Sequence, residues 1–272
     1  MITATASAAA AAAAVLAVSA RWNWWRPKVG GLASLMYHKV GDHPPGSKIE
    51  KLWVTAKDFR RQMEWLKSRG YATLTFTELK NAEDGKSPMP ARPALVTFDD
   101  GYANNYELAF PILAEMGMKG NIFLVWDTVG RHNAWHDPAG EPWLRMLTWG
   151  QVGEMQRSGV IEFGSHTVTH RNLAEISLED VAWEARESKK RLEEKLGRGV
   201  LGFAYPYGAG AFVPEVRRCA REAGYRYDFS IKQGITPIPW DPASGPMMRL
   251  LIRGDDTMVD FHLNMTRGRA RL

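Results

Sequence analysis

Residues 94–102 read ALVTFDDGY, an apolar run that ends in two adjacent carboxylates and a glycine. A run of this kind is typical of a strand buried in a protein core. Placing the charges of Asp99 and Asp100 at the end of such a strand costs free energy unless they are paired or bind a metal ion. A solvent-exposed Asp-Gly turn would explain the same residues. The residues at the other strand ends are needed to distinguish such a turn from a functional site.

From residue 33 onward, similar apolar runs alternate with amphipathic helical patterns. Strands are expected at 33–38, 71–75, 94–98, 120–125, 160–164, 200–204, 226–231 and 247–252. Helices are expected after Thr55 and at 77–83, 103–116, 148–158, 177–196 and 213–223. This α/β alternation with short connections predicts a parallel sheet covered by helices, and seven or eight units favour a closed or nearly closed barrel. No glycine-rich phosphate loop follows a strand, which disfavours a nucleotide-binding sheet.

The boundaries of one helix are marked in the sequence. Ser177 and Asp180 have the spacing of a capping box, with Asp in place of Glu, and Gly197 is placed to end the helix. No linker interrupts residues 32–272, which we interpret as a single catalytic domain. Residues 126–147 form the longest expected insertion.

Composition excludes several classes of protein. Of the 272 residues, 45% are hydrophobic and 24% are charged, which indicates a folded chain. The net charge is +5, but no Lys/Arg block is interleaved with aromatic residues, so we expect no nucleic-acid partner. The single cysteine, Cys219, excludes an internal disulfide.

Residues 1–31 form a separate segment. Residues 2–20 carry no charge and precede the Trp-rich stretch RWNWWRPK. The pattern predicts either an export signal cleaved after Ala20 or an uncleaved membrane anchor. Arg21, Arg26 and Lys28 follow the apolar segment, which for an anchor would favour a cytoplasmic domain. We expect an exported protein of the periplasm or cell envelope, with membrane association through the N-terminus as the alternative.

A second strand end carries two histidines in FGSHTVTH. His166 and His170 are four residues apart, a spacing that predicts both rings on one side of a helical turn, where they can hold a divalent metal ion. A chance pair of histidines is the alternative. With Asp100 they would give three ligands and leave a position open for water or substrate. Asp99 would then remain as a base for the attacking water.

A third strand end is the turn in GFAYPYGAG. Pro206 and Gly208 force the chain to turn tightly, and such a turn can point a backbone N–H into a pocket, where it stabilises a developing oxyanion. An ordinary Pro/Gly turn explains the same residues.

Together, TFDDG, SHTVTH and AYPYG resemble, in this order, the polysaccharide deacetylases of the NodB-homology group, carbohydrate esterase family four. The resemblance spans about residues 33–260. It implies a distorted (β/α) barrel of about seven strands and metal-dependent removal of acetyl groups from sugar polymers. It also implies the site residues: Asp99 as catalytic base, Asp100, His166 and His170 as metal ligands, and the Tyr207 N–H as oxyanion donor. The ion is expected to be zinc, although cobalt and nickel suit the same ligands.

Two departures from the commoner branch of that family are informative. Ala204 stands where that branch has an arginine beside the base, and Arg249 in MMRLLIRGDD is the candidate to supply the charge, with an ordinary surface arginine as the alternative. The late histidine, His262, lies in a helical pattern. MYHKV instead resembles the branch that includes the poly-N-acetylglucosamine deacetylases, where the acid histidine comes from the first strand. His38 is therefore the candidate general acid, and His262 is the alternative.

We predict a metal-dependent hydrolase that removes acetyl groups from N-acetylhexosamine units of an envelope or extracellular polysaccharide. Two alternatives stay open: a catalytically silent glycan-binding module on the same barrel, and a deacylase of a small amide or acetyl ester. Seven aromatic residues are expected around the barrel mouth, where they could stack on sugar rings: Tyr37, Trp126, Trp135, Trp143, Tyr205, Tyr207 and Trp240. The sequence leaves the polymer and the oligomeric state open.

Overall fold

The computed structural model describes residues 7, 15, 17–19, 21–133 and 135–271. Most of the apolar part of the predicted export signal or anchor lies outside the described residues. Among the helices that are described, none is long and apolar enough to cross a membrane.

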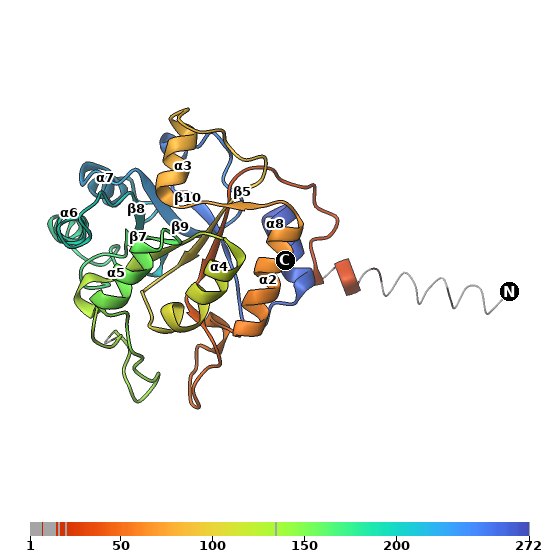
Figure 1. Ribbon diagram of the computed structural model, residues 1–272, viewed down its shortest axis with the longest axis horizontal. Helices are drawn as coiled ribbons and strands as arrows, with labels where there is room; N and C mark the ends of the chain where they lie inside the picture. The colour runs from red at the N-terminus through yellow and green to blue at the C-terminus, as the bar shows by residue number, and fades with distance from the viewer. Residues whose placement is uncertain (1–6, 8–14, 16, 20, 134, 272) are drawn as a thin grey trace.

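A closed barrel of seven parallel strands forms the body of the protein (Figure 1). The barrel strands are β1 (Ala33–Tyr37), β5 (Pro93–Phe98), β6 (Gly120–Leu124), β7 (Ile161–Ser165), β8 (Gly202–Ala204), β9 (Tyr227–Gln233) and β10 (Met247–Leu251). Their order is β1-β10-β9-β8-β7-β6-β5, and pairing of β1 with β5 closes the ring. β4 (Ala72–Thr73) pairs with the start of β5, and β2 (Lys39–Val40) pairs with β3 (Trp53–Val54) in a separate small sheet.

Helices surround this barrel (Figure 1). The α-helices are α2 (Ala56–Ser68), α3 (Phe76–Glu83), α4 (Phe110–Met116), α5 (Trp149–Arg157), α6 (Leu178–Leu196), α7 (Pro214–Glu222) and α8 (Met258–Arg267). Short helical turns are η1 (Glu50–Leu52), η2 (Asn105–Ala109), η3 (Trp126–Thr128), η4 (Pro206–Gly208) and η5 (Pro242–Ser244). Between β9 and β10 the described chain has only η5, so the barrel is distorted there. The predicted α/β fold, a distorted (β/α) barrel in a single domain, is confirmed.

Successive side chains of a strand point to opposite faces, so the apolar core is divided into two clusters. Val96 and Ile122 point outward into the cluster that the helices cover, whereas Leu95 and Phe123 belong to a second cluster. In that second cluster the ring of Phe76, from α3, lies 5.3 Å from Phe123. Apolar side chains therefore make up much of the barrel interior, although a few polar residues such as Asn121 are buried there as well.

Helix α6 begins and ends as the sequence predicts, with one difference. The Ser177 hydroxyl accepts the Asp180 N–H at 3.1 Å, and Gly197 ends the helix with φ of 66°. The return bond of a capping box is missing, because the Asp180 carboxylate faces Arg171 at 3.4 Å instead. The capping-box prediction is therefore only half right.

Candidate active site

Most of the predicted site residues lie at the carboxyl ends of barrel strands. His38 follows β1, Asp99 and Asp100 follow β5, His166 follows β7, and Tyr207 follows β8. Parallel strands bring these ends to one mouth of the barrel. Asp99 lies four residues after Leu95, so its side chain is on the same face of the strand and points inward over the packed interior.

The group formed by Asp100, His166 and His170 has the composition of a metal site. Their ligand atoms lie within 4.8 Å of one another, and all three side chains are buried. Asp100 Oδ1 is 3.4 Å from His166 Nε2 and 3.3 Å from His170 Nε2. Ring contacts reinforce the group, since the two imidazole centroids are 5.0 Å apart.

The hydrogen bonding of His166 tests whether these residues fit a cation. His166 Nδ1 lies 2.7 Å from the Ala204 carbonyl, which can only accept, so Nδ1 carries the proton. In the neutral ring, Nε2 then presents a lone pair to the Asp100 carboxylate. A lone pair and a carboxylate repel each other unless a proton or a metal ion lies between them, and, against the effect of burial, the Asp100 carboxylate accordingly raises the pKa of His166. The residues therefore fit a divalent metal ion, and the donor set of two imidazoles and one carboxylate suits zinc.

The loop that carries the two histidines is not a helical turn, so that prediction was wrong. Thr167 and His170 both have left-handed backbone conformations, with φ of 71° and 63°. Glu184, buried on α6, fixes the loop by accepting the Val168 N–H at 2.7 Å and the Thr169 N–H at 3.1 Å. A distant carboxylate, rather than helical spacing, brings the two rings together.

Backbone strain is concentrated at this site. Among the described residues, four that are not glycine have positive φ: Asp100 (74°), Thr167 (71°), His170 (63°) and Tyr207 (59°). Such conformations cost on the order of 1 kcal/mol each and persist only where the surroundings enforce them. All four belong to the predicted motifs, and this clustering supports a functional site at this mouth.

Arg249 and Asp99 form a buried ion pair. The guanidinium donates from Nη1 to Oδ1 at 2.6 Å and from Nη2 to Oδ2 at 2.8 Å, and its Nε donates to the Ser230 carbonyl at 3.0 Å. Burial alone would raise the pKa of Asp99, but Arg249, His166 and His38 together lower that pKa below its ordinary value. Asp99 is therefore ionised at neutral pH and able to accept a proton.

The two candidate acid histidines lie at opposite ends of the barrel. His38 follows the last residue of β1, and its Nδ1 is buried without a hydrogen-bond partner among the described residues. Burial lowers the pKa of His38, while Asp99 and Asp100 act in the opposite direction. His262 instead lines a cavity of about 300 Å³ together with Ala33, the first residue of β1.

Two aromatic rings contact the metal group. Trp135, from the insertion after β6, stacks on His170 with centroids 4.1 Å apart. The Tyr207 ring, 52% exposed, meets His170 edge-on at 4.7 Å. The Tyr207 N–H donates to no other group in the described part of the chain. Trp135 and Trp143 line a cavity of about 360 Å³ beside this group.

Four of the seven aromatic residues predicted for the mouth are not placed for sugar stacking. Tyr37 and Tyr205 are buried, and their hydroxyls donate to Gln62 at 2.7 Å and Asp228 at 3.0 Å. Trp126 packs on Trp149 at 4.9 Å, and Trp240 packs on Tyr227 at 5.9 Å. Side chains from other elements cover or pack against these rings, and the local sequence around each ring does not show which ones.

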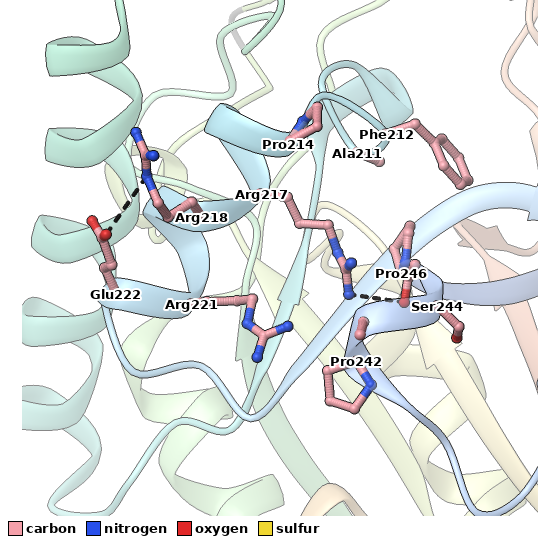
Figure 2. A pocket seen from close by; sticks show the side chains of 12 residues that line it. Ala211, Phe212, Pro214, Arg217, Arg218, Arg221, Glu222, Pro242, Ser244 and Pro246 are labelled. Carbon is pink, nitrogen blue, oxygen red and sulfur yellow. Dashed lines mark hydrogen bonds and ion pairs between the residues drawn. The ribbon is translucent and has the colours of Figure 1, made fainter.

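A larger groove of about 680 Å³ lies between α7 and residues 242–246 (Figure 2). Arg217 crosses it and donates to the Gly245 carbonyl at 2.8 Å, and Arg218 faces Glu222 at 3.6 Å. None of the predicted site residues lines it. The groove follows the distorted part of the barrel, and the chemistry-bearing residues gather elsewhere.

The comparisons with known proteins identify the family of the chain. Residues 86–227 match the family profile described as polysaccharide deacetylase. Bacillus subtilis YxkH is 30% identical over 207 residues, which cover 76% of this chain and 67% of YxkH. The poly-β-1,6-N-acetyl-D-glucosamine N-deacetylase of Staphylococcus epidermidis is 27% identical, with 82% and 79% of the two chains covered. Among curated relatives, the aligned share of their own length runs from 20% to 79%.

A solved structure extends the likeness to the fold. The polysaccharide deacetylase of Bacillus cereus superposes with a TM-score of 0.73 at 27% identity, covering 87% of this chain and 69% of that one.

Proposed function

Because the chain belongs to the polysaccharide deacetylase family, we propose that it removes acetyl groups from N-acetylhexosamine units of an envelope or extracellular polysaccharide. The observation that carries the proposal is the adjacency of two buried groups. Asp99, held ionised by Arg249, directly precedes Asp100, which faces His166 and His170. A base beside a three-residue metal site is an arrangement that supports hydrolysis of an unactivated amide by a bound water.

In this proposal Asp100, His166 and His170 hold a divalent ion, zinc in preference to cobalt or nickel. The bound ion would supply Lewis acidity, which polarises the acetyl carbonyl and lowers the pKa of a coordinated water. The Ala204 carbonyl holds the His166 ring in the orientation and tautomer that this binding needs.

The chain's own residues then handle the protons. Asp99 accepts a proton from the water whose oxygen bonds to the acetyl carbon. The Tyr207 N–H donates to the carbonyl oxygen as it becomes anionic. His38, once protonated, gives a proton to the sugar nitrogen when the C–N bond breaks, so that acetate and a free amine leave.

Sugar binding is assigned to the rings beside the metal group. Trp135 and Trp143 line a cavity next to His170, and the exposed Tyr207 ring meets His170 edge-on. Aromatic faces of this kind pack on the apolar faces of sugar rings. The choice of N-acetylhexosamine rests on the name of the Staphylococcus epidermidis relative. Export to the periplasm or cell envelope, where such polymers lie, is proposed from the apolar segment 2–20.

The proposal is tested by acetate release from N-acetylglucosamine oligomers, using metal-stripped protein with zinc, cobalt or nickel added back. We expect metal-dependent release that Asp99→Asn abolishes and that Glu179→Gln, an exposed carboxylate change on α6, leaves intact. Release from acetyl esters alone would favour a small-ester deacylase. Oligomer binding without release, equal in wild type and Asp99→Asn, would favour a silent glycan-binding module.

A further inference from the structure

The cavity that His262 lines carries a positive charge that the proposed reaction does not use. It holds about 300 Å³, and three further cationic side chains line it: Lys28, Arg69 and Arg92. Among the described residues, no carboxylate belongs to its lining. Lys28, Arg69 and Arg92 are exposed, so a ligand from solvent can reach them. We call this the His262 cavity.

The cations of the His262 cavity have no counter-charge of their own. Within the described part of the chain, Lys28, Arg69 and Arg92 form no ion pair. Arg69 lies over the ring of Trp65 at 5.6 Å, and Arg92 lies over that of Tyr71 at 5.9 Å. Arg92 also donates to the Arg69 carbonyl at 2.7 Å. Because like charges at short range repel each other, this arrangement gains stability when an anion enters the cavity.

His262 experiences this excess of positive charge. Burial lowers the pKa of His262, and the charges of Arg69, Arg267 and Lys28 lower it further. The imidazole is therefore neutral at neutral pH, and it meets the ring of Trp65 edge-on with centroids 5.6 Å apart. The cations that surround it are left for an anion from outside the chain to balance.

The backbone beside these cations offers free hydrogen-bond donors. The Val29 N–H donates to the Thr266 carbonyl at 2.9 Å, which holds the segment 28–31 against α8. The N–H groups of Gly30 and Gly31, which also line the cavity, donate to no acceptor in the described part of the chain. Cationic side chains together with free backbone N–H groups are the donors that bind phosphate oxygens in proteins. A phosphate group therefore suits the His262 cavity.

The chain approaches this cavity through residues that suit a membrane surface. Lys28 is the last residue of RWNWWRPK, in which Trp24 and Trp25 are 46% and 56% exposed. Tryptophan and cationic residues together are typical of the interface between a membrane and water. Figure 1 shows the N-terminal segment leaving the body of the protein beside α8. The aromatic residues of an interface therefore directly precede the residues that line the cavity.

We propose that the His262 cavity binds the phosphate of an anionic phospholipid headgroup and so seats the protein on a membrane surface. Ala33, the first residue of β1, lines the cavity, whereas His38 and Asp99 follow the opposite ends of β1 and β5. The catalytic mouth then faces away from the bilayer, toward a polymer outside it. This inference does not depend on which reaction takes place at the mouth.

The first test measures how the full chain partitions onto vesicles of phosphatidylcholine with and without phosphatidylglycerol. Arg69→Gln/Arg92→Gln should reduce the preference for anionic vesicles about 25-fold, since each cation near an anionic surface contributes about fivefold. Arg218→Gln/Arg221→Gln removes the same charge from α7, across the barrel in Figure 1, and should keep the preference. A contribution of the apolar segment 2–20 affects both kinds of vesicle and cancels in the ratio. Equal losses in the two double variants would show attraction by net charge alone and would overturn the proposal.

The second test distinguishes a bound headgroup from general attraction to an anionic surface. A Cβ atom at Gly30 would meet no other atom within 4 Å, so Gly30→Gln adds a side chain to the cavity lining without a clash and without a change of charge. Calorimetry with monomeric dihexanoyl phosphatidylglycerol should show one bound molecule per wild-type chain and binding at least about tenfold weaker in Gly30→Gln. Undiminished binding in Gly30→Gln contradicts the proposal.

Inorganic phosphate and acetate release complete the controls. Inorganic phosphate that binds wild type more tightly than the lipid does, without any preference for anionic vesicles, would assign the cavity to a soluble phosphate and overturn the membrane proposal. Gly30→Gln and Arg69→Gln/Arg92→Gln change no residue of the catalytic mouth. Their acetate release from a soluble N-acetylglucosamine oligomer should therefore equal that of the wild type, which shows that a loss of lipid binding does not come from misfolding.

Discussion

At the scale of single residues, Arg249 determines whether Asp99 can act as a base. The pair is buried and doubly hydrogen-bonded, so Arg249→Met would leave the Asp99 charge without a partner inside the barrel. The pKa of Asp99 should then rise, because burial is no longer opposed by the guanidinium. We expect acetate release at neutral pH to fall on the order of 10²-fold, and stability to fall by about 3 kcal/mol. Activity profiles against pH and denaturant unfolding measure the two effects.

A double variant provides the control for this prediction. Arg249→Met combined with Asp99→Asn removes both charges, so much of the lost stability should return while activity stays absent. If the double variant is as unstable as Arg249→Met alone, packing of the arginine rather than its charge is what matters.

A second prediction at this scale concerns the general acid. His38 lies at the mouth with Asp99, whereas His262 lies at the other end of β1. We expect His38→Ala to lower kcat by about 10² to 10⁴-fold, and His262→Ala to leave it within about threefold of wild type. Steady-state kinetics on an N-acetylglucosamine oligomer decide this. Retained activity in the first variant and loss in the second would reverse the assignment.

At the scale of elements, the turn η4 contributes the backbone N–H of Tyr207 to the proposed site rather than a side chain. Tyr207 has φ of 59°, a conformation that glycine adopts without strain. Tyr207→Gly keeps the N–H and the turn but removes the ring that meets His170. We expect kcat to stay within about threefold, while KM rises because a sugar-stacking face is lost. A fall of kcat by about 10²-fold would show that the ring or its hydroxyl takes part in the chemistry.

The same scale shows why some elements were predictable and others were not. Strands such as β5 and β6 follow from local apolar runs, and both lie where the sequence predicts them. The loop 166–170 was assigned a helical turn because only its spacing was visible. Its true conformation depends on Glu184, which arrives from α6 and accepts two of the loop's backbone N–H groups. Contacts between residues distant in the chain leave no local pattern.

At the scale of the whole molecule, closure of the barrel brings the motifs together. β1 pairs with both β5 and β10, so the ends that carry His38 and Asp99 are neighbours and Arg249 reaches across to them. A parallel barrel implies this convergence, which is why the residues of the mouth could be named from sequence. The burial of Tyr37 and the surroundings of Lys39 could not be predicted from the sequence. Both depend on side chains that distant segments contribute, namely α2, β3 and the 126–147 insertion.

Hydrogen bonds join the two ends of the described chain, and the last prediction concerns what they contribute to stability. The Asn23 N–H donates to the Ala270 carbonyl at 2.8 Å, and Trp22 Nε1 donates to Asp260 at 2.9 Å. Asn23 is fully buried, and its Nδ2 donates to the Arg271 carbonyl at 2.6 Å. Removing residues 1–20 leaves these bonds intact, so the melting temperature should not change.

Removing residues 1–28 instead breaks all of these bonds and exposes the surface that Asn23 covers. At about 1 kcal/mol for each lost hydrogen bond, unfolding should become easier by roughly 2–3 kcal/mol. Denaturant unfolding of the two truncated proteins and of Trp22→Phe, which keeps a ring but loses one N–H, measures the contribution of each bond. Equal stability of the two truncated proteins would show that this contact between the ends does not support the barrel.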